Sequence, residues 1–308
     1  AEGMVYPYYD TDKNVGVLVE VNAETDFVAK NDKFTSFVKA DANTVVTENP
    51  ADLDALLATT IADGTLSVAD AIQELFLSLR ENLKLRRFVL VEGTAVSYIH
   101  AGGSVGVLVS FDTNAADNAD FVAMGKNIAM QVAAMNPEYL SKEDMSEAEL
   151  ENMKSITIDS SLNKPESLPK PILNKLFETA VNDKLFSDAD IAAYEAEKNN
   201  KFLFNFLSKE AVATLAQLAV AGKEEYVNNK IFAGAVDGRI KKQLKEICLL
   251  DQTFVRSDLF DGTVAGYVAD VAKKLGAEIK VTGFVRLAKG EGIEKKEDNF
   301  AAEVASMM

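Results

Sequence analysis

The pentapeptide VGVLV occurs twice in the chain, at Val15–Val19 and at Val105–Val109, and the tetrapeptide DFVA follows each copy, at Asp26–Ala29 and at Asp120–Ala123. β-branched residues dominate the pentapeptide, which is typical of a strand. The residues after each copy follow a helical rather than an alternating pattern. Because both peptides recur in the same order, they predict an internal repeat in which a strand leads into a helix.

Each VGVLV strand is preceded by a stretch rich in turn-forming residues, Asp10–Asn14 in the first copy and Ala101–Ser104 in the second. Such stretches between apolar runs indicate β-hairpins. An isolated hairpin buries too little surface to be stable, so we expect a third strand in each copy. Arg87–Glu92 (RFVLVE) and Glu278–Ala288 (EIKVTGFVRLA) have a suitable composition. The predicted fold class is α+β: two subdomains, each with a small three-stranded antiparallel sheet and helices packed on one face.

Apolar residues after each VGVLV copy recur at the spacing of a helix that packs on its sheet. In the first copy, Phe27, Phe34 and Val38 lie at successive spacings of seven and four residues. The corresponding face in the second copy comprises Phe121, Met124, Ile128 and Val132. We expect Phe121 to be a core residue.

The stretch from Glu138 to Ile247 is almost wholly helical in pattern and is interrupted by Pro165, Pro169 and Pro171. Proline ends or bends a helix, so the chain must turn at these positions. The pattern predicts a helical, coiled-coil-like region inserted into the second subdomain. The predicted domain limits are 1–93 for the first core subdomain, 94–140 with 250–290 for the second, 141–249 for the insertion and 291–308 for a C-terminal module.

The charge balance favours a protein partner over nucleic acid. Acidic side chains number 48 against 32 basic ones, a net charge of −16, whereas binding to phosphates depends on Lys and Arg. No apolar run approaches the ~20 residues needed to cross a bilayer. The single cysteine, Cys248, has apolar neighbours, which fits a core position in a reducing compartment. We expect a cytoplasmic protein without direct nucleic-acid or membrane contact.

The sequence shows no signature of a catalytic or cofactor site. One histidine, His100, and one cysteine cannot complete the usual tetrahedral zinc site. AGGSVG (Ala101–Gly106) leads into a strand, not into the helix that a phosphate loop requires, and KGEGIEKK (Lys289–Lys296) lacks the Walker pattern. We therefore expect neither an active site nor a metal or cofactor. An acid–base hydrolase using Glu24 and Asp26 is an alternative.

The segment Val19–Asn31 (VEVNAETDFVAKN) joins the first strand to the first helix. Asn22 and Thr25 can cap the exposed N–H groups of the helix, and the acidic residues of the segment suit its positive end. These roles leave Phe27 unexplained. An aromatic residue in the first helical turn, bracketed by acids, is expected to project outward rather than into the core.

This segment closely resembles the signature of elongation factor Ts, in which a strand runs into TDFVAK. Three further segments are similar to that family and follow in the family's order. They are Glu81–Gly93 (ENLKLRRFVLVEG), Ile128–Leu140 (IAMQVAAMNPEYL) and Gly283–Ala305 (GFVRLAKGEGIEKKEDNFAAEVA). The resemblance implies two subdomains with three-stranded sheets and a helical hairpin inserted into the second.

The function that the resemblance implies is guanine nucleotide exchange: the protein binds elongation factor Tu–GDP and promotes release of GDP during translation elongation. Asp26 and Phe27 would enter the G domain of elongation factor Tu beside its magnesium site. Thr25 and Val28 would complete this contact. A non-catalytic protein-binding scaffold of the same fold, with the helical insertion as its main surface, is the alternative.

The resemblance implies two further contacts with elongation factor Tu. The helix Ile128–Met135, which carries Gln131, would belong to the subdomain that meets domain 3, although the family often has histidine where Gln131 stands. Phe300 would belong to a C-terminal module, Asn299–Met308, that meets the G domain. The helical insertion can mediate dimerisation in this family, which leaves a homodimer open. The family's N-terminal helical domain is expected to be absent from this sequence.

Overall fold

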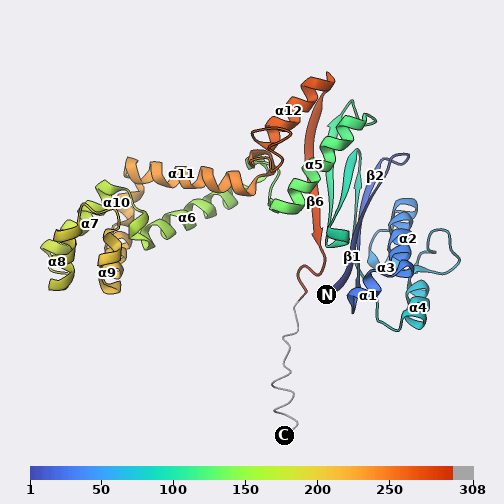
Figure 1. The fold of residues 1–308 in the computed structure, drawn as a ribbon, viewed down its shortest axis with the longest axis horizontal. Helices are drawn as coiled ribbons and strands as arrows, with labels where there is room; N and C mark the ends of the chain where they lie inside the picture. The colour runs from blue at the N-terminus through green and yellow to red at the C-terminus, as the bar shows by residue number, and fades with distance from the viewer. Residues whose placement is uncertain (294–308) are drawn as a thin grey trace, which may run out of the picture. The chain divides into compact units, whose positions relative to one another are not determined.

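The computed structural model describes residues 1–293. The chain divides into two compact units, one formed by Ala1–Leu140 with the chain from Leu249 onward, the other by Ser141–Cys248. Within the described residues, the first unit contains two three-stranded antiparallel sheets with helices, and the second is helical (Figure 1). The predicted α+β fold is confirmed.

The first sheet has the strand order β1-β2-β3. Its strands are β1 (Glu2–Asp10), β2 (Val15–Ala23) and β3 (Lys84–Glu92). The predicted hairpin and the predicted third strand are both present, and the register places Val17 opposite Tyr8 on one side and Leu90 on the other. The helices of this subdomain are α1 (Asp26–Ala29), α2 (Asp32–Glu48), α3 (Leu53–Ala58) and α4 (Val68–Leu79).

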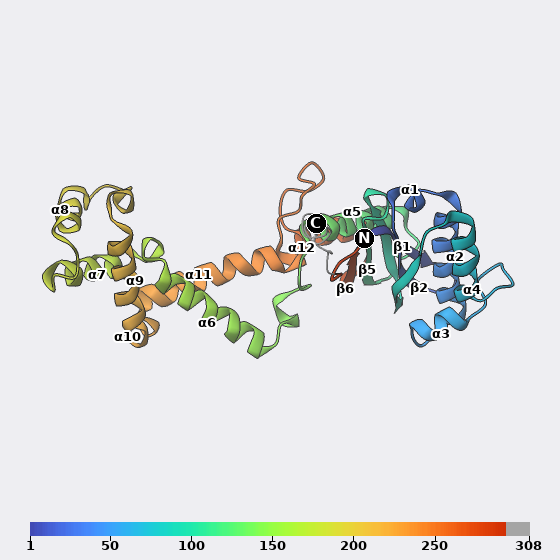
Figure 2. The ribbon, with the colours of Figure 1, turned by 90° about the horizontal axis from the view of Figure 1, so that it is seen from below.

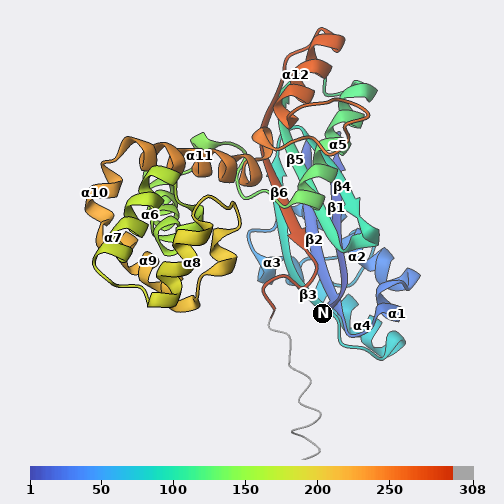
Figure 3. The ribbon, with the colours of Figure 1, turned by 60° about the vertical axis from the view of Figure 1, so that its left-hand side comes forward.

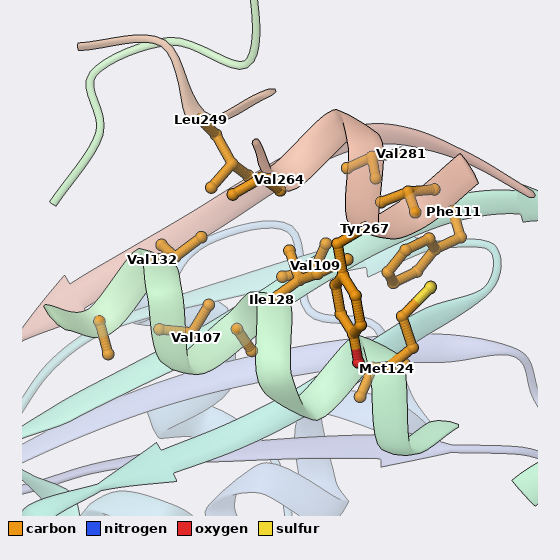
Figure 4. Close-up of a cluster of buried hydrophobic side chains, with 14 of the residues drawn as sticks. Val107, Val109, Phe111, Met124, Ile128, Val132, Leu249, Val264, Tyr267 and Val281 are labelled. Carbon is orange, nitrogen blue, oxygen red and sulfur yellow. The ribbon is translucent and has the colours of Figure 1, made fainter. Parts of the chain in front are cut away.

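The second sheet has the order β4-β5-β6. Its strands are β4 (Ala95–His100), β5 (Val105–Thr113) and β6 (Ile279–Ala288), and its main helices are α5 (Ala119–Met135) and α12 (Val264–Leu275). Figure 4 shows Val107 and Val109 of β5 facing Ile128 and Val132 of α5, with Tyr267 of α12 closing the same core. The four predicted core residues of α5 are all buried, so this prediction is confirmed.

The two sheets also pack against each other through a separate apolar cluster. Its buried members are Val5, Leu18, Leu108 and Leu287. Figure 2 shows the resulting layers, with α5 and α12 outside one sheet and α2, α3 and α4 outside the other, and Figure 3 shows the strands of both sheets side by side. Each VGVLV strand is therefore buried on both faces, which explains why its apolar run is uninterrupted rather than alternating with polar residues.

The second unit is a helical bundle with its own core. The helices are α6 (Glu147–Asn163), α7 (Lys170–Asn182), α8 (Asp188–Glu197), α9 (Lys209–Ala221), α10 (Lys223–Val227) and α11 (Lys230–Ile247). Phe177, Leu215 and Phe232 are buried at its centre. Pro165 starts a single 3₁₀ turn and Pro169 precedes α7, so these prolines lie at turns, as predicted.

Candidate functional site

A short helical turn at the end of β2 presents an aromatic side chain to solvent. β2 ends at Ala23, and α1 begins after Thr25, whose backbone is extended (φ −125°) and whose Oγ1 accepts a hydrogen bond from the N–H of Val28 at 3.4 Å. Asp26 is exposed, and Phe27 is 85% exposed. The prediction that Phe27 projects outward is therefore confirmed.

The two DFVA copies have opposite orientations. In the first copy Phe27 is exposed and Val28 is buried, whereas in the second Phe121 is 1% exposed and Val122 is 38% exposed. The cap explains the difference: Thr25 directly precedes the first copy, but Asn118 caps α5 two residues before Asp120. The same four residues are thus shifted by one position in the helix, which rotates them by ~100°.

The predicted apolar face of the first helix is wrong at Phe27. Phe34 and Val38 are buried in the first core, but Phe27 is not. The cause is a break in the helix: α1 ends at Ala29, and Asn31 caps a new helix, α2, by accepting a hydrogen bond from the N–H of Lys33 at 2.8 Å. The heptad spacing therefore joined residues of two separate helices.

The turn that carries Phe27 is held by Glu81, a residue that sequence reasoning missed. One carboxylate oxygen of Glu81 accepts hydrogen bonds from the backbone N–H groups of Glu24 (3.1 Å) and Thr25 (3.0 Å), and the other accepts from the Thr25 hydroxyl. The antiparallel pairing of β2 with β3 could have indicated this contact. Because β3 runs antiparallel to β2 with Lys84 opposite Asn22, residues just before Lys84 must lie beside those just after Asn22.

The structure does not support direct partner contacts by two of the predicted binding residues. Gln131 is wholly buried in α5, where its amide donates to the Gln252 side chain and to the Thr253 carbonyl, both at 3.1 Å, and accepts from the N–H of Val255 at 2.9 Å. Its role in the fold is to fix the chain segment after Gln252. Val28 is 6% exposed and packs into the first core.

Of the other predicted contact residues, Thr25 is partly exposed and caps α1, while Asp26 and Phe27 lie on the surface. Phe300 lies outside the described residues. The structure thus groups Thr25, Asp26 and Phe27 in one turn.

No group of three or more His, Cys, Asp or Glu side chains within residues 1–293 has the arrangement to hold a metal ion. His100, the only histidine of the chain, lies at the end of β4, and its Nδ1 is 3.0 Å from the Tyr98 hydroxyl. Cys248 is buried, as predicted. In the same described range, no helix combines the length and apolar character that crossing a bilayer requires.

Comparison with known proteins shows the family to which the chain is related. Residues 24–291 match the family model described as "Elongation factor TS". Elongation factor Ts of Clostridioides difficile is 36% identical over all of this chain and 81% of the relative. The Syntrophotalea carbinolica protein of the same name is 34% identical with the same coverage, and that of Trichlorobacter lovleyi is 35% identical over 99% of this chain and 80% of the relative. The chain therefore belongs to the elongation factor Ts family of translation factors.

Proposed function

We propose that this protein is a guanine nucleotide exchange factor that binds elongation factor Tu–GDP and accelerates release of GDP. The observation that carries the proposal is the side chain of Phe27, which is 85% exposed on a turn whose backbone is fixed by Glu81. Among the large hydrophobic side chains of the described residues it is the most exposed, and its burial against a partner would be favourable. Membership of the elongation factor Ts family supports this choice of partner.

The mechanism is a coupling between two ligands of elongation factor Tu. If the exchange factor lowers the affinity for GDP, GDP lowers the affinity for the exchange factor by the same factor. Phosphates and magnesium hold GDP through charge and backbone N–H groups. Burial of Phe27 in the partner is worth ~1.5–3 kcal/mol, and this gain offsets part of the cost of disturbing that site. Asp26, exposed beside it, brings negative charge toward the same region.

Because its backbone is already fixed, the Phe27 turn loses little conformational entropy when Phe27 binds a partner. A flexible loop that must be ordered on binding loses part of its interaction free energy. Here Thr25 caps α1 and bonds to Glu81, so the turn is already ordered in the free protein. Most of the free energy from burying Phe27 is therefore available for displacing the nucleotide.

The proposal is tested with Phe27→Ala. We expect this variant to lose ~2–4 kcal/mol of coupling, as central contacts of interfaces do, and to slow the release of a fluorescent GDP analogue from elongation factor Tu by at least about tenfold. The matched control is Val122→Ala, which truncates the outward-facing residue of the second DFVA copy. An unchanged release rate with Phe27→Ala would exclude the side chain from the mechanism.

The setting that goes with this function is the cytoplasm, with elongation factor Tu as the protein partner and no direct contact with nucleic acid or membrane. The net charge of −16 supports the absence of a nucleic-acid contact, because a surface of that sign repels phosphate. Co-purification with elongation factor Tu in a nuclease-treated extract tests this part of the proposal.

A second candidate function is favoured by the exposed aromatic residues of the helical unit. Phe202 and Phe206 are 56% and 50% exposed. Phe202 precedes and Phe206 ends a 3₁₀ turn, Leu203–Phe206, which lines a hollow of about 420 Å³ beside Phe177 and Tyr194. A scaffold that binds through this unit, or a homodimer formed by it, would use these side chains. Sedimentation of the wild type and of Phe202→Ser separates the two, since only a homodimer changes mass with the substitution.

A further inference from the structure

Glu20 is a wholly buried carboxylate in the middle of β2, and four separate groups donate hydrogen bonds to it. Arg87 Nε is 2.6 Å and Arg86 Nη1 is 3.1 Å from its Oε1, while its Oε2 accepts from the Asn22 amide at 2.9 Å and from the N–H of Gly290 at 2.8 Å. A buried charge is tolerated only when it is paired and hydrogen-bonded in this way. The site is therefore built for a carboxylate at this position.

A β-bulge allows two consecutive arginines to reach one carboxylate. Glu20 pairs with Arg87, but Val21 pairs with Leu85, so Arg86 is the extra residue in β3. Neighbouring side chains in a regular strand point to opposite faces, whereas a bulge places two residues opposite one. The irregularity in β3 thus brings both guanidinium groups to Glu20.

The donor from Gly290 links Glu20 to a different part of the chain. Gly290 follows β6, the last strand of the second sheet, in the loop through which the chain continues toward residues 294–308. The loop has further ties to the first sheet: Arg87 donates to the Ala288 carbonyl at 3.0 Å, and Lys289 Nζ is 3.2 Å from the Glu2 carboxylate. Arg86 also donates to the backbone carbonyl of Glu291.

The same strand continues from Glu20 to the turn that presents Phe27. Residues Glu20–Ala23 complete β2, and Thr25 then caps α1. The backbone between Glu20 and Thr25 is fixed by pairing with β3 and by Glu81. The loop 289–293 and the Phe27 turn are consequently both attached to the C-terminal half of β2.

We propose that Glu20 is a positioning residue for partner binding. Its carboxylate fixes the loop 289–293 to β2, so that this loop and the Phe27 turn are presented to elongation factor Tu in one fixed geometry. The proposal rests on the exchange function proposed above. Glu20 itself is buried and touches neither nucleotide nor partner. Its effect on exchange arises from the two segments that it joins.

The test is Glu20→Gln in the full chain, followed by hydrogen exchange and by GDP release. Glutamine keeps the shape of the side chain but removes the charge that holds both arginines. We expect the hydrogen-exchange protection factors of the amides in the loop 289–293 to fall by at least about tenfold, much more than those of α2. We expect GDP release to slow by at least about fivefold. Lys289→Met, which removes only the outer tie to Glu2, is expected to shift both measurements in the same direction by less.

The matched control is Leu56→Ala, which removes a buried side chain from the outer helical layer of the same subdomain. It lowers the unfolding temperature but is expected to leave loop protection and GDP release, per folded molecule, at wild-type values. Retained protection in Glu20→Gln overturns the proposed tether. Lost protection with GDP release equal to that of the Leu56→Ala control overturns the positioning role. A wild-type chain that fails to accelerate release overturns the exchange function instead, and the hydrogen-exchange result still decides whether Glu20 holds the loop.

Discussion

Two carboxyl groups are fully buried in the first subdomain, and their surroundings differ completely. Burial raises the pKa of Glu20, but the Gly290 N–H, the Asn22 amide and Arg87 outweigh it and hold the pKa below its ordinary value. Asp41 of α2 is equally buried, yet neither of its oxygens has a hydrogen-bond partner among the described residues. Burial alone raises the pKa of Asp41 to about 8. Glu20 is therefore ionised and Asp41 protonated at neutral pH.

Asp41 makes the stability of the protein fall as pH rises. Between its ordinary pKa of 3.8 and about 8, the folded state keeps the proton that the unfolded state has lost. Stability then falls by up to ~1.4 kcal/mol per pH unit, and the loss is complete above the folded pKa. We expect urea denaturation to show this decline between pH 6 and pH 8.

The control for this effect is Asp41→Asn, which cannot ionise at that position. The difference in unfolding free energy between wild type and variant isolates Asp41 from the other titrating groups. We expect the unfolding free energy of the variant, relative to that of the wild type, to increase steadily as pH rises. A difference that is independent of pH would show that Asp41 is ionised in the folded protein.

At the scale of the element, the position of a helix cap decides whether a DFVA segment is core or surface. Thr25 and Asn118 each accept a hydrogen bond from the third residue of their helix, which is Val28 in one case and Phe121 in the other. That third residue faces the sheet in both subdomains. A shift of the cap by one residue has thus converted a core phenylalanine into an exposed one without changing the four residues.

The two phenylalanines are accordingly expected to separate stability from function. Phe121→Ala removes a ring that packs edge-on against Phe111 at a centroid distance of 4.9 Å, and should lower the unfolding free energy by ~3–5 kcal/mol. Phe27→Ala should leave it within about 0.5 kcal/mol of the wild type. Chemical denaturation of both variants measures this. Equal losses would mean that Phe27 packs within its own subdomain in solution.

The parts of the fold that depend on composition were predictable, and those that depend on single hydrogen bonds were not. A run such as Val15–Val19 is apolar throughout and rich in β-branched valine, a composition that favours a strand over a buried helix. By contrast, the heptad from Phe27 to Phe34 gave no sign that Asn31 restarts the helix. The family resemblance suggested Gln131 as a partner contact, whereas hydrogen bonds to the Gln252 side chain and to the backbone of Thr253 and Val255 keep it inside.

At the scale of the whole first unit, the glycine of each VGVLV copy permits the two sheets to pack together. A Cβ atom on Gly106 would lie 2.6 Å from Cγ1 of Val5 in the opposite sheet, and a Cβ atom on Gly16 would lie 3.1 Å from Cδ2 of Leu108. Neither glycine needs an unusual backbone conformation, since neither has a positive φ. Both are required by the close approach of the other sheet, which ties the two subdomains into one unit.

The two contacts should respond differently to an added methyl group. Val5 is β-branched and wholly buried, so it cannot rotate away from a side chain at position 106, whereas Leu108 meets position 16 with the ends of a longer side chain. We expect Gly106→Ala to lower the unfolding free energy by ~1–3 kcal/mol, the usual cost of overpacking, and Gly16→Ala to cost less. Urea denaturation of both variants decides the order. If Gly16→Ala proved the more costly, Val5 would have to be the side chain that yields, and the sheets would be held apart by Leu108 instead.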